Sequence, residues 1–219
     1  ILYRLVGSEM CIRDRVGATG NVGRKLIEVL EKKNFPVTEA YLVASPNSAG
    51  KKIHFLGKEH TVINLEEFDF SKVKIAFFAA GSAIAEKWAP IAAEKTIVID
   101  NSKFFRKDPE IPLIVPEVNS KELPKFKNKN IVANANCSVI PIVVALKPLH
   151  DLYNVKRIVA STYQSVSGAG KAGMDELISQ TKEVLENKNV HSKNFTKQIA
   201  FNAIPHIDSF LENGSTKEE

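Results

Sequence analysis

A short glycine turn near the start of the chain constrains the fold more than any other feature. Residues 17–23 read GATGNVG, and the following segment, residues 24–33, places Leu26, Ile27 and Leu30 on one helical face. Glycines let the backbone turn tightly and approach a pyrophosphate, whose charge the next helix N-terminus favours. This pattern predicts the phosphate loop of a dinucleotide-binding fold, with a plain tight turn as the alternative. Gly17, Gly20 and Gly23 of this loop are candidate contacts of the dinucleotide.

The sequence just before this turn does not fit such a loop. The strand that leads into it lies in the middle of a parallel sheet and is usually a near-continuous apolar run. Arg13, Asp14 and Arg15 stand there instead, and burying three charges is costly unless all are paired. We therefore expect residues 1–15, with Cys11, to be foreign sequence fused to a gene fragment. A divergent N-terminus with paired charges is the alternative.

Beyond residue 15, short apolar runs alternate with amphipathic ones. This alternation is typical of an α/β fold with a doubly wound parallel sheet, followed here by a second, smaller unit. Residues 101–130 are rich in Lys and Pro and are predicted to be irregular. The predicted strands are Ala40–Ala44, His60–Leu65, Val73–Ala80, Thr96–Asp100, Ile131–Ala133 and Arg157–Tyr163, and the later predicted helices are Ser82–Lys95, Ser138–Leu152 and Lys171–Asn187.

Composition argues against several classes of protein. The 219 residues are 44% hydrophobic and 25% charged, as in ordinary globular proteins. No apolar run reaches the roughly 18 to 20 residues of a membrane span, and the opening is too short and polar for a signal peptide, so we expect a cytoplasmic protein. The net charge of +5 is spread over scattered lysines, which argues against a nucleic-acid surface. Two distant cysteines indicate neither a disulfide framework nor a metal site.

The segment after the second predicted strand bears on the choice of cofactor. It reads ASPNSAGKK over residues 44–52 and contains no carboxylate. NAD-specific sites usually carry Asp or Glu about 20 residues after the glycine turn, to bind the ribose 2′-hydroxyl. Hydroxyls, an amide and two lysines can instead bind a 2′-phosphate, although a polar turn has the same composition. We expect NADP, with Ser45, Asn47 and Ser48 as candidate contacts.

One cysteine stands where a nucleophile is expected. Residues 134–141 read NANCSVIP, and Cys137 directly precedes an apolar run that predicts a buried helix. A thiol at a helix N-terminus lies near N–H donors and the positive end of the helix dipole, which favour the thiolate. Asn134 and Asn136 flank it in a polar turn. We therefore predict a catalytic cysteine, with an inert buried side chain as the alternative.

A third stretch, QSVSGAG at residues 164–170, also lies between a predicted strand and a predicted helix. A loop of small residues can lie under a flat ring such as nicotinamide, while the Gln164 amide contacts a substrate. Glycine-rich turns are common, so this motif carries little weight alone.

In this order, the three stretches resemble bacterial aspartate-semialdehyde dehydrogenases. The matching segments are VGATGNVG, ASPNSAGK, DNSKFFRKDP with PLIVPEVN, ANCS, YQSVSGAGKAG and AFNAIPHID, and they span residues 16–219. The resemblance implies a Rossmann-type NADP-binding domain over residues 16–133 and an incomplete α/β catalytic and dimerisation domain over residues 134–219. It also implies a homodimer, when intact, that converts aspartyl phosphate to aspartate semialdehyde for lysine, threonine and methionine synthesis.

The resemblance also implies roles for single residues. Cys137 corresponds to the nucleophile that forms a thioester, and Gln164 to the residue that orients the substrate, with Asn136 as a further contact. Arg106 corresponds to the phosphate-binding arginine, whose guanidinium suits a phosphate dianion. No metal ligand is implied. The implied cofactor contacts are Thr19, Gly20, Asn21 and Val22 at the pyrophosphate, Asn47 and Ser48 at the 2′-phosphate, and Ser167 and Gly168 at the nicotinamide.

Some positions depart from the family pattern. Asn47 stands where arginine is common, so we expect a weaker preference for NADP. Ala135 and Val139 replace a frequent proline and threonine beside the cysteine. The family's acid–base histidine, carboxylate-binding arginine and a phosphate-binding lysine follow the IPHID stretch, beyond Glu219. We therefore expect the 219 residues alone to lack turnover.

Two other functions stay open. An N-acetyl-γ-glutamyl-phosphate reductase shares the fold, the cofactor and the thioester chemistry, and it acts on a longer acyl phosphate. A non-catalytic nucleotide-binding module would keep the fold but leave Cys137 unreactive.

Overall fold

The computed structural model describes residues 13–37 and 39–216. It divides into two compact units, residues 1–162 and residues 163–219, and each is described by itself. The domain boundary expected after residue 133 lies ahead of the last long helix of the first unit.

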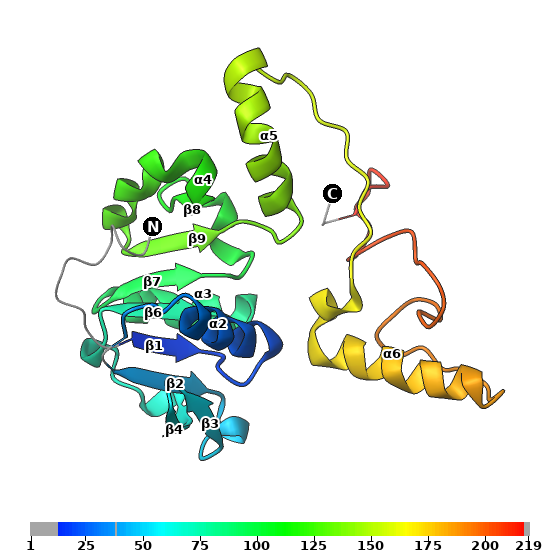
Figure 1. Cartoon of the computed structure of the whole chain (residues 1–219), viewed down its shortest axis with the longest axis horizontal. Helices are drawn as coiled ribbons and strands as arrows, with labels where there is room; N and C mark the ends of the chain where they lie inside the picture. The colour runs from blue at the N-terminus through cyan, green and yellow to red at the C-terminus, as the bar shows by residue number, and fades with distance from the viewer. Residues whose placement is uncertain (1–12, 38, 217–219) are drawn as a thin grey trace. The chain divides into compact units, whose positions relative to one another are not determined.

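The first unit is built on a parallel sheet. Seven strands follow the order β5-β2-β1-β6-β7-β9-β8 and pair in parallel, and the arrows of β1, β2, β7 and β9 run the same way in Figure 1. The chain order reverses between β1 and β6, which is the switch point where ligands bind in open α/β sheets. The strands are β1 (Arg13–Val16), β2 (Ala40–Ala44), β5 (Ile63–Asn64), β6 (Ile75–Phe78), β7 (Ile97–Asp100), β8 (Leu113–Ile114) and β9 (Ile131–Asn134), with β3 (Lys52–Phe55) and β4 (Lys58–Thr61) forming a separate antiparallel pair.

Helices cover both faces of this sheet. Successive strand residues point to opposite faces, so Leu42 packs in a cluster with Ile27 while Val43 packs in another with Ala89. The two clusters contain the buried faces of α2 and α3 respectively, as a doubly wound sheet requires. The helices of this unit are α2 (Asn21–Lys32), α3 (Ser82–Ala93), α4 (Pro116–Asn119) and α5 (Val139–Tyr153), with shorter turns η1 (Pro46–Ser48), η2 (Leu65–Glu67), η3 (Phe70–Lys72), η4 (Phe104–Lys107) and η5 (Ser120–Asn128).

The charged segment ahead of the glycine turn does form a strand, contrary to our expectation. Residues 13–16 pair in parallel with residues 40–43 on one side and residues 75–78 on the other. Every residue except proline offers the same main-chain donor and acceptor, so two neighbouring strands can hold this backbone whatever its side chains. Residues 1–12, including Cys11, lie outside the described residues, and the foreign origin of residues 1–15 stays a prediction.

Two further expectations are wrong. Residues 157–163 form no strand, and Tyr163 is 98% exposed. The apolar run after Cys137 forms α5 as predicted, but none of its residues is buried among the described parts of the chain. Both segments are apolar enough for a core. Their local sequence, however, does not specify the neighbouring strand or surface that would have to cover them. Leu152, for example, is 74% exposed.

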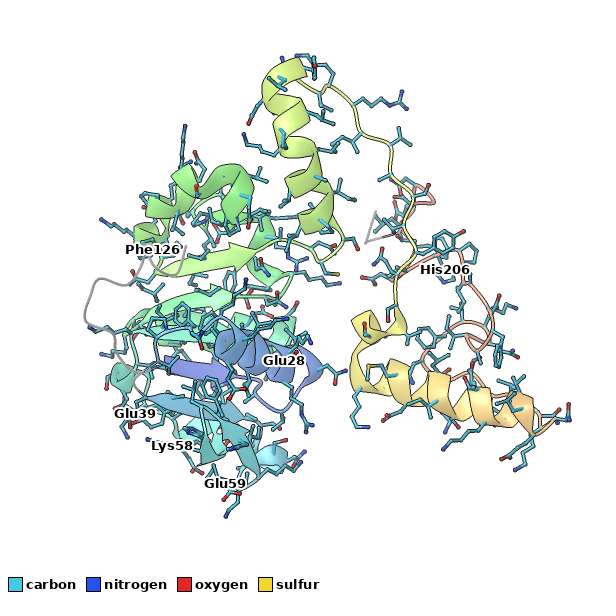
Figure 2. The ribbon with its side chains drawn as sticks, viewed as in Figure 1. Glu28, Glu39, Lys58, Glu59, Phe126 and His206 are labelled. Atoms are coloured by element: carbon cyan, nitrogen blue, oxygen red, sulfur yellow. The ribbon has the colours of Figure 1, made fainter. Side chains whose placement is uncertain are left out.

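The second unit contains one long helix and irregular chain. Helix α6 (Gly170–Leu185) follows the turn η6 (Val166–Ala169), close to the predicted helix 171–187. The chain after it contains an isolated antiparallel bridge between Phe210 and Thr216. Figure 2 labels His206 on this irregular part.

Candidate active site

The glycine turn between β1 and α2 is packed too closely for side chains. Gly17 has a φ of +90°, and a Cβ there would lie 2.9 Å from the carbonyl carbon of Ala79. A Cβ on Gly23 would lie 2.2 Å from the carbonyl oxygen of Gly17. Neither position can accept a side chain unless backbone moves, so α2 starts directly against the turn.

The N-terminus of α2 has the charge pattern of an anion site. Gly20 is the N-cap residue, and neither a side-chain cap nor an acidic first-turn residue is present. The helix dipole therefore presents uncompensated positive charge at this turn. The predicted pyrophosphate contacts Thr19, Asn21 and Val22 belong to the turn and to the first residues of the helix, and Val22 is 50% exposed.

The turn after β2 lies against the glycine turn. Ser45 and Asn47 are exposed, and the half-buried Ser48 hydroxyl oxygen accepts a hydrogen bond from the Thr19 hydroxyl at 3.3 Å. The structure therefore brings together the residues predicted for the pyrophosphate and the 2′-phosphate. Glycine turn, polar turn and helix N-terminus together form a cradle that suits the phosphates of a dinucleotide.

Cys137 lies in a turn that connects β9 to α5. The Asn136 side-chain oxygen accepts the Ser138 N–H at 2.8 Å, and its main-chain oxygen accepts the N–H groups of Val139 and Ile140, both at 3.1 Å. Asn136 therefore accepts three N–H groups from the turn and the start of α5, and this holds the position of the next residue. Cys137 is exposed, with its Sγ 4.0 Å from the Ser138 hydroxyl oxygen.

Arg106 is tied to the same turn. Its Nε donates to the main-chain oxygen of Asn134 at 2.9 Å, and its Nη2 donates to that of Asn101 at 3.3 Å. The Asn134 amide also donates to the Asn101 side-chain oxygen at 2.7 Å. These bonds join the ends of β7 and β9 in one hydrogen-bonded cluster, which contains the predicted phosphate-binding arginine and lies at the strand end three residues ahead of the predicted nucleophile.

The sequence analysis missed a buried carboxyl group in this cluster. Asp100 is fully buried at the end of β7, where its Oδ2 accepts the Ser102 hydroxyl at 2.6 Å. Its Oδ1 has no hydrogen-bond partner among the described residues. Burial raises the pKa of Asp100 above its ordinary value, against the opposing effects of Ser102 and Arg106. The signal available in the sequence was an acidic residue at the end of an otherwise apolar strand.

The remaining predicted residues belong to the second unit. Gln164 is exposed, and Ser167 and Gly168 lie in η6, where the Ser165 hydroxyl oxygen accepts the Ser167 N–H at 3.2 Å. These residues belong to the second unit and Cys137 belongs to the first, and each unit is described by itself. Their assigned roles stay predictions.

His206 has partners within the second unit. Its Nε2 lies 3.4 Å from the Thr196 hydroxyl, and its ring lies 5.0 Å from the Phe210 ring. Across the described residues, no three His, Cys, Asp or Glu side chains gather as metal ligands. None of the described helices combines the length and the apolar composition that crossing a membrane requires.

Comparison with known proteins identifies the family. Residues 16–126 match a family model described as the NAD-binding domain of semialdehyde dehydrogenase, and residues 146–219 match its dimerisation domain. The chain belongs to the semialdehyde dehydrogenase family. Its predicted phosphate loop, and the turn after β2, fall inside the match to the family's NAD-binding domain.

Relatives within the semialdehyde dehydrogenases are similar over most of the chain. Aspartate-semialdehyde dehydrogenase 2 of Vibrio cholerae is 54% identical over 93% of this chain and 60% of its own length. A crystal structure of aspartate-semialdehyde dehydrogenase II from Vibrio cholerae, complexed with ASA, gives a TM-score of 0.95 at 52% identity, covering 97% of this chain and 63% of that one. The chain thus spans about three fifths of the length of these relatives.

A more distant solved structure bears on the cofactor. Aspartate-semialdehyde dehydrogenase with NADP from Candida albicans gives a TM-score of 0.53 at 27% identity, covering 67% of this chain and 48% of that one. Together with the matched NAD-binding domain, it indicates a nicotinamide cofactor.

Proposed function

We propose that this chain carries the cofactor loop and the nucleophile of an NADP-dependent aspartate-semialdehyde dehydrogenase. The reaction is the reversible conversion of aspartyl phosphate to aspartate semialdehyde, which serves lysine, threonine and methionine synthesis. The observation that carries the proposal is that exposed Cys137 follows Asn136 in the turn between β9 and α5, with Arg106 bonded to Asn134 at the end of β9. The relatives named for this activity support the choice of substrate.

The cradle beside β1 fits the cofactor. Gly17 and Gly23 allow a tight turn in which a Cβ would collide with backbone, and the helix N-terminus beside them favours a pyrophosphate. NADPH, when bound, supplies the hydride for the reduction. Ser45, Asn47 and Ser48 offer neutral hydrogen-bonding groups to a 2′-phosphate, and no carboxylate in their turn repels it. The preference for NADP over NAD follows from this charge pattern.

The proposed reaction of the substrate takes place at Cys137. The thiolate of Cys137 attacks the acyl carbon of aspartyl phosphate, and the C–O bond to phosphate breaks as the thioester forms. The thioester carbon would then accept the hydride that NADPH supplies when bound, and release of the aldehyde would return the free thiolate of Cys137. Arg106 uses its remaining N–H groups to hold the phosphate, and Gln164 of the second unit orients the substrate.

The intact enzyme is proposed to be a homodimer. Residues 146–219 match a dimerisation domain, and α5 keeps apolar side chains exposed, including Leu149 at 48% and Leu152 at 74%. Uncovered apolar faces of this kind are typical of obligate interfaces.

A chimera tests the proposal. Residues 16–219 would replace the matching residues of the Vibrio cholerae relative, and NADPH formation from aspartate semialdehyde would be followed with and without phosphate. We expect phosphate-dependent turnover that Cys137→Ser removes and that the neighbouring change Ser138→Ala largely keeps. An active Cys137→Ser chimera would contradict the thioester mechanism.

The same chimera separates the alternatives. Turnover of N-acetylglutamate semialdehyde in preference to aspartate semialdehyde would favour the longer-substrate reductase. A chimera that binds NADPH, shows no turnover and leaves Cys137 unlabelled by iodoacetamide would favour a non-catalytic module.

A further inference from the structure

Thr19 connects an arginine on α2 to the turn after β2. The Nε of Arg24 donates to the main-chain oxygen of Thr19 at 3.3 Å, and the Thr19 hydroxyl donates to the Ser48 hydroxyl oxygen at 3.3 Å. The guanidinium of Arg24 is therefore held where the glycine turn and the polar turn meet. Its other N–H groups make no hydrogen bond to the described residues.

The carboxylates near Arg24 are bound elsewhere. Glu28, labelled on α2 in Figure 2, stands at the i+4 position but pairs with Lys25 at 2.7 Å. Glu31 accepts the main-chain N–H of Leu56 at 2.6 Å. Arg24 consequently forms no ion pair within the described parts of the chain, and its positive charge stays available to a ligand.

Space and access also suit a ligand. Arg24 is exposed and lines an open hollow of about 320 Å³ between α2 and β3. Lys52, on the opposite wall, pairs with Glu59 at 2.6 Å, and Glu59 is labelled on the β3–β4 hairpin in Figure 2. Glu28 and Glu31 also line the hollow, each with the partner named above, so Arg24 is the lining cation that has no carboxylate partner among the described residues.

We infer that Arg24 binds the 2′-phosphate of NADP and is a specificity-determining residue of this chain. The inference rests on the proposed function and deepens it. Ser45, Asn47 and Ser48 provide only neutral side chains, whereas a phosphate dianion is held most strongly by charge-assisted bonds from a guanidinium. Arg24 is linked to the same turn through Thr19 and Ser48. Its guanidinium would add charge beside the exposed Lys51, where Asn47 supplies none.

Equilibrium binding of nucleotide fragments to the 219-residue chain tests this role without any assay of turnover. The probes are 2′,5′-ADP, which carries the 2′-phosphate, and 5′-AMP, which lacks it, each titrated by calorimetry. We expect Arg24→Gln to weaken 2′,5′-ADP about tenfold and 5′-AMP less than about twofold. Lys32→Gln, which removes the same charge from the last turn of α2, should change neither. Adding Asn47→Arg to Arg24→Gln should restore 2′,5′-ADP binding.

The outcomes separate the two proposals. An equal loss for both probes in Arg24→Gln would show that Arg24 only braces Thr19, and would overturn the inference. Preference for 2′,5′-ADP that survives Arg24→Gln would overturn the inference and leave the NADP assignment intact. A wild-type chain that binds both probes equally well would contradict the NADP assignment, and the inference with it.

Discussion

The two units of the chain are held together by different kinds of contact. In the first unit, strands bond to neighbouring strands, and three apolar clusters fill the space between sheet and helices. In the second unit, side chains of α6 bond to the main chain of an irregular segment. Two of the buried residues of α6 are polar, Glu176 and Gln180, at 8% and 1% exposed.

The contacts of these two residues hold the irregular segment of the second unit against α6. Both Glu176 and Gln180 project from one face of α6, since they are four residues apart. The Glu176 carboxylate accepts the main-chain N–H groups of Lys193 and Asn194 at 3.0 and 2.6 Å. The Gln180 side-chain oxygen accepts that of Ile199 at 2.8 Å. Side chains of α6 thus accept main-chain N–H groups of the irregular chain, as the carbonyl groups of a neighbouring strand do in the first unit.

The difference teaches that single substitutions act by different routes in the two units. Backbone contacts in the first unit are many and redundant, so a change must disturb packing to be felt. Contacts in the second unit are few and involve particular polar atoms, so the loss of one side chain leaves several N–H groups without a partner.

The largest effect is expected from Gly23→Ala in the first unit. The new Cβ would lie 2.2 Å from the Gly17 carbonyl oxygen, and only movement of α2 away from the glycine turn would relieve that contact. We expect a loss of more than about 3 kcal/mol in the free energy of unfolding, measured by urea denaturation. Trp88, the single tryptophan, belongs to α3 and reports this unit.

A matched glycine in the second unit provides the control. A Cβ on Gly168 would meet nothing within 4 Å, so Gly168→Ala should leave both units as stable as before. Equal destabilisation by the two substitutions would mean that close packing at the glycine turn is not what distinguishes the first unit.

The next largest effect is expected from Glu176→Ala in the second unit. Removing the carboxylate leaves the N–H groups of Lys193 and Asn194 without their partner, at a cost of about 2 kcal/mol. Amide hydrogen exchange should accelerate over residues 192–200, while the unfolding midpoint reported by Trp88 stays unchanged. Asp175→Ala, at the neighbouring exposed position on α6, is the control. Similar acceleration in the control variant would argue that any change of charge on α6 loosens the segment.

The same contrast explains how much of the fold the sequence predicts. Strand β2 falls at the predicted residues 40–44, because a short continuous apolar run between turn residues is typical of a buried strand. Residues 157–163 have a similar apolar pattern and form no strand, because a strand needs a neighbour that local sequence does not specify. The strand at residues 13–16 shows the converse, since its neighbours provide main-chain partners where the side chains argue against a strand.

The candidate site divides along similar lines. Glycine spacing was enough to locate the cradle at Gly17 and Gly23, because nearby backbone atoms exclude a Cβ at both positions. Bonds between distant segments, such as Arg106 to Asn134, and the buried carboxyl group of Asp100 depend on how β7 and β9 pair. That pairing leaves no local mark in the sequence.

The smallest effect, a dependence on pH, sharpens the comparison because two carboxyl groups shift in opposite directions. Burial alone would raise the pKa of Glu176, but the N–H groups of Lys193 and Asn194 and the Asn194 amide together hold it below its ordinary value. Burial raises the pKa of Asp100 in the first unit.

The signs of the two contributions follow from these shifts. A lowered folded-state pKa means that Glu176 stabilises the second unit above its unfolded pKa of about 4.3, and that this contribution is lost as the pH falls through the folded value. A raised folded-state pKa means that Asp100 takes up a proton in the folded protein first. The first unit therefore gains stability as the pH falls from neutral through the folded pKa of Asp100, and the gain levels off below about 3.9.

Two isosteric amides test these signs separately. Asp100→Asn should remove the gain in the Trp88 unfolding midpoint that the wild type shows on mild acidification, relative to the same measurement at pH 7. Glu176→Gln should remove the acceleration of amide exchange at residues 192–200 below about pH 4, after correction for intrinsic exchange rates. A midpoint that rises equally in the wild type and in Asp100→Asn would assign the pH response of the first unit to other carboxylates. The buried carboxyl group would then keep one protonation state in the folded protein between pH 7 and mild acid.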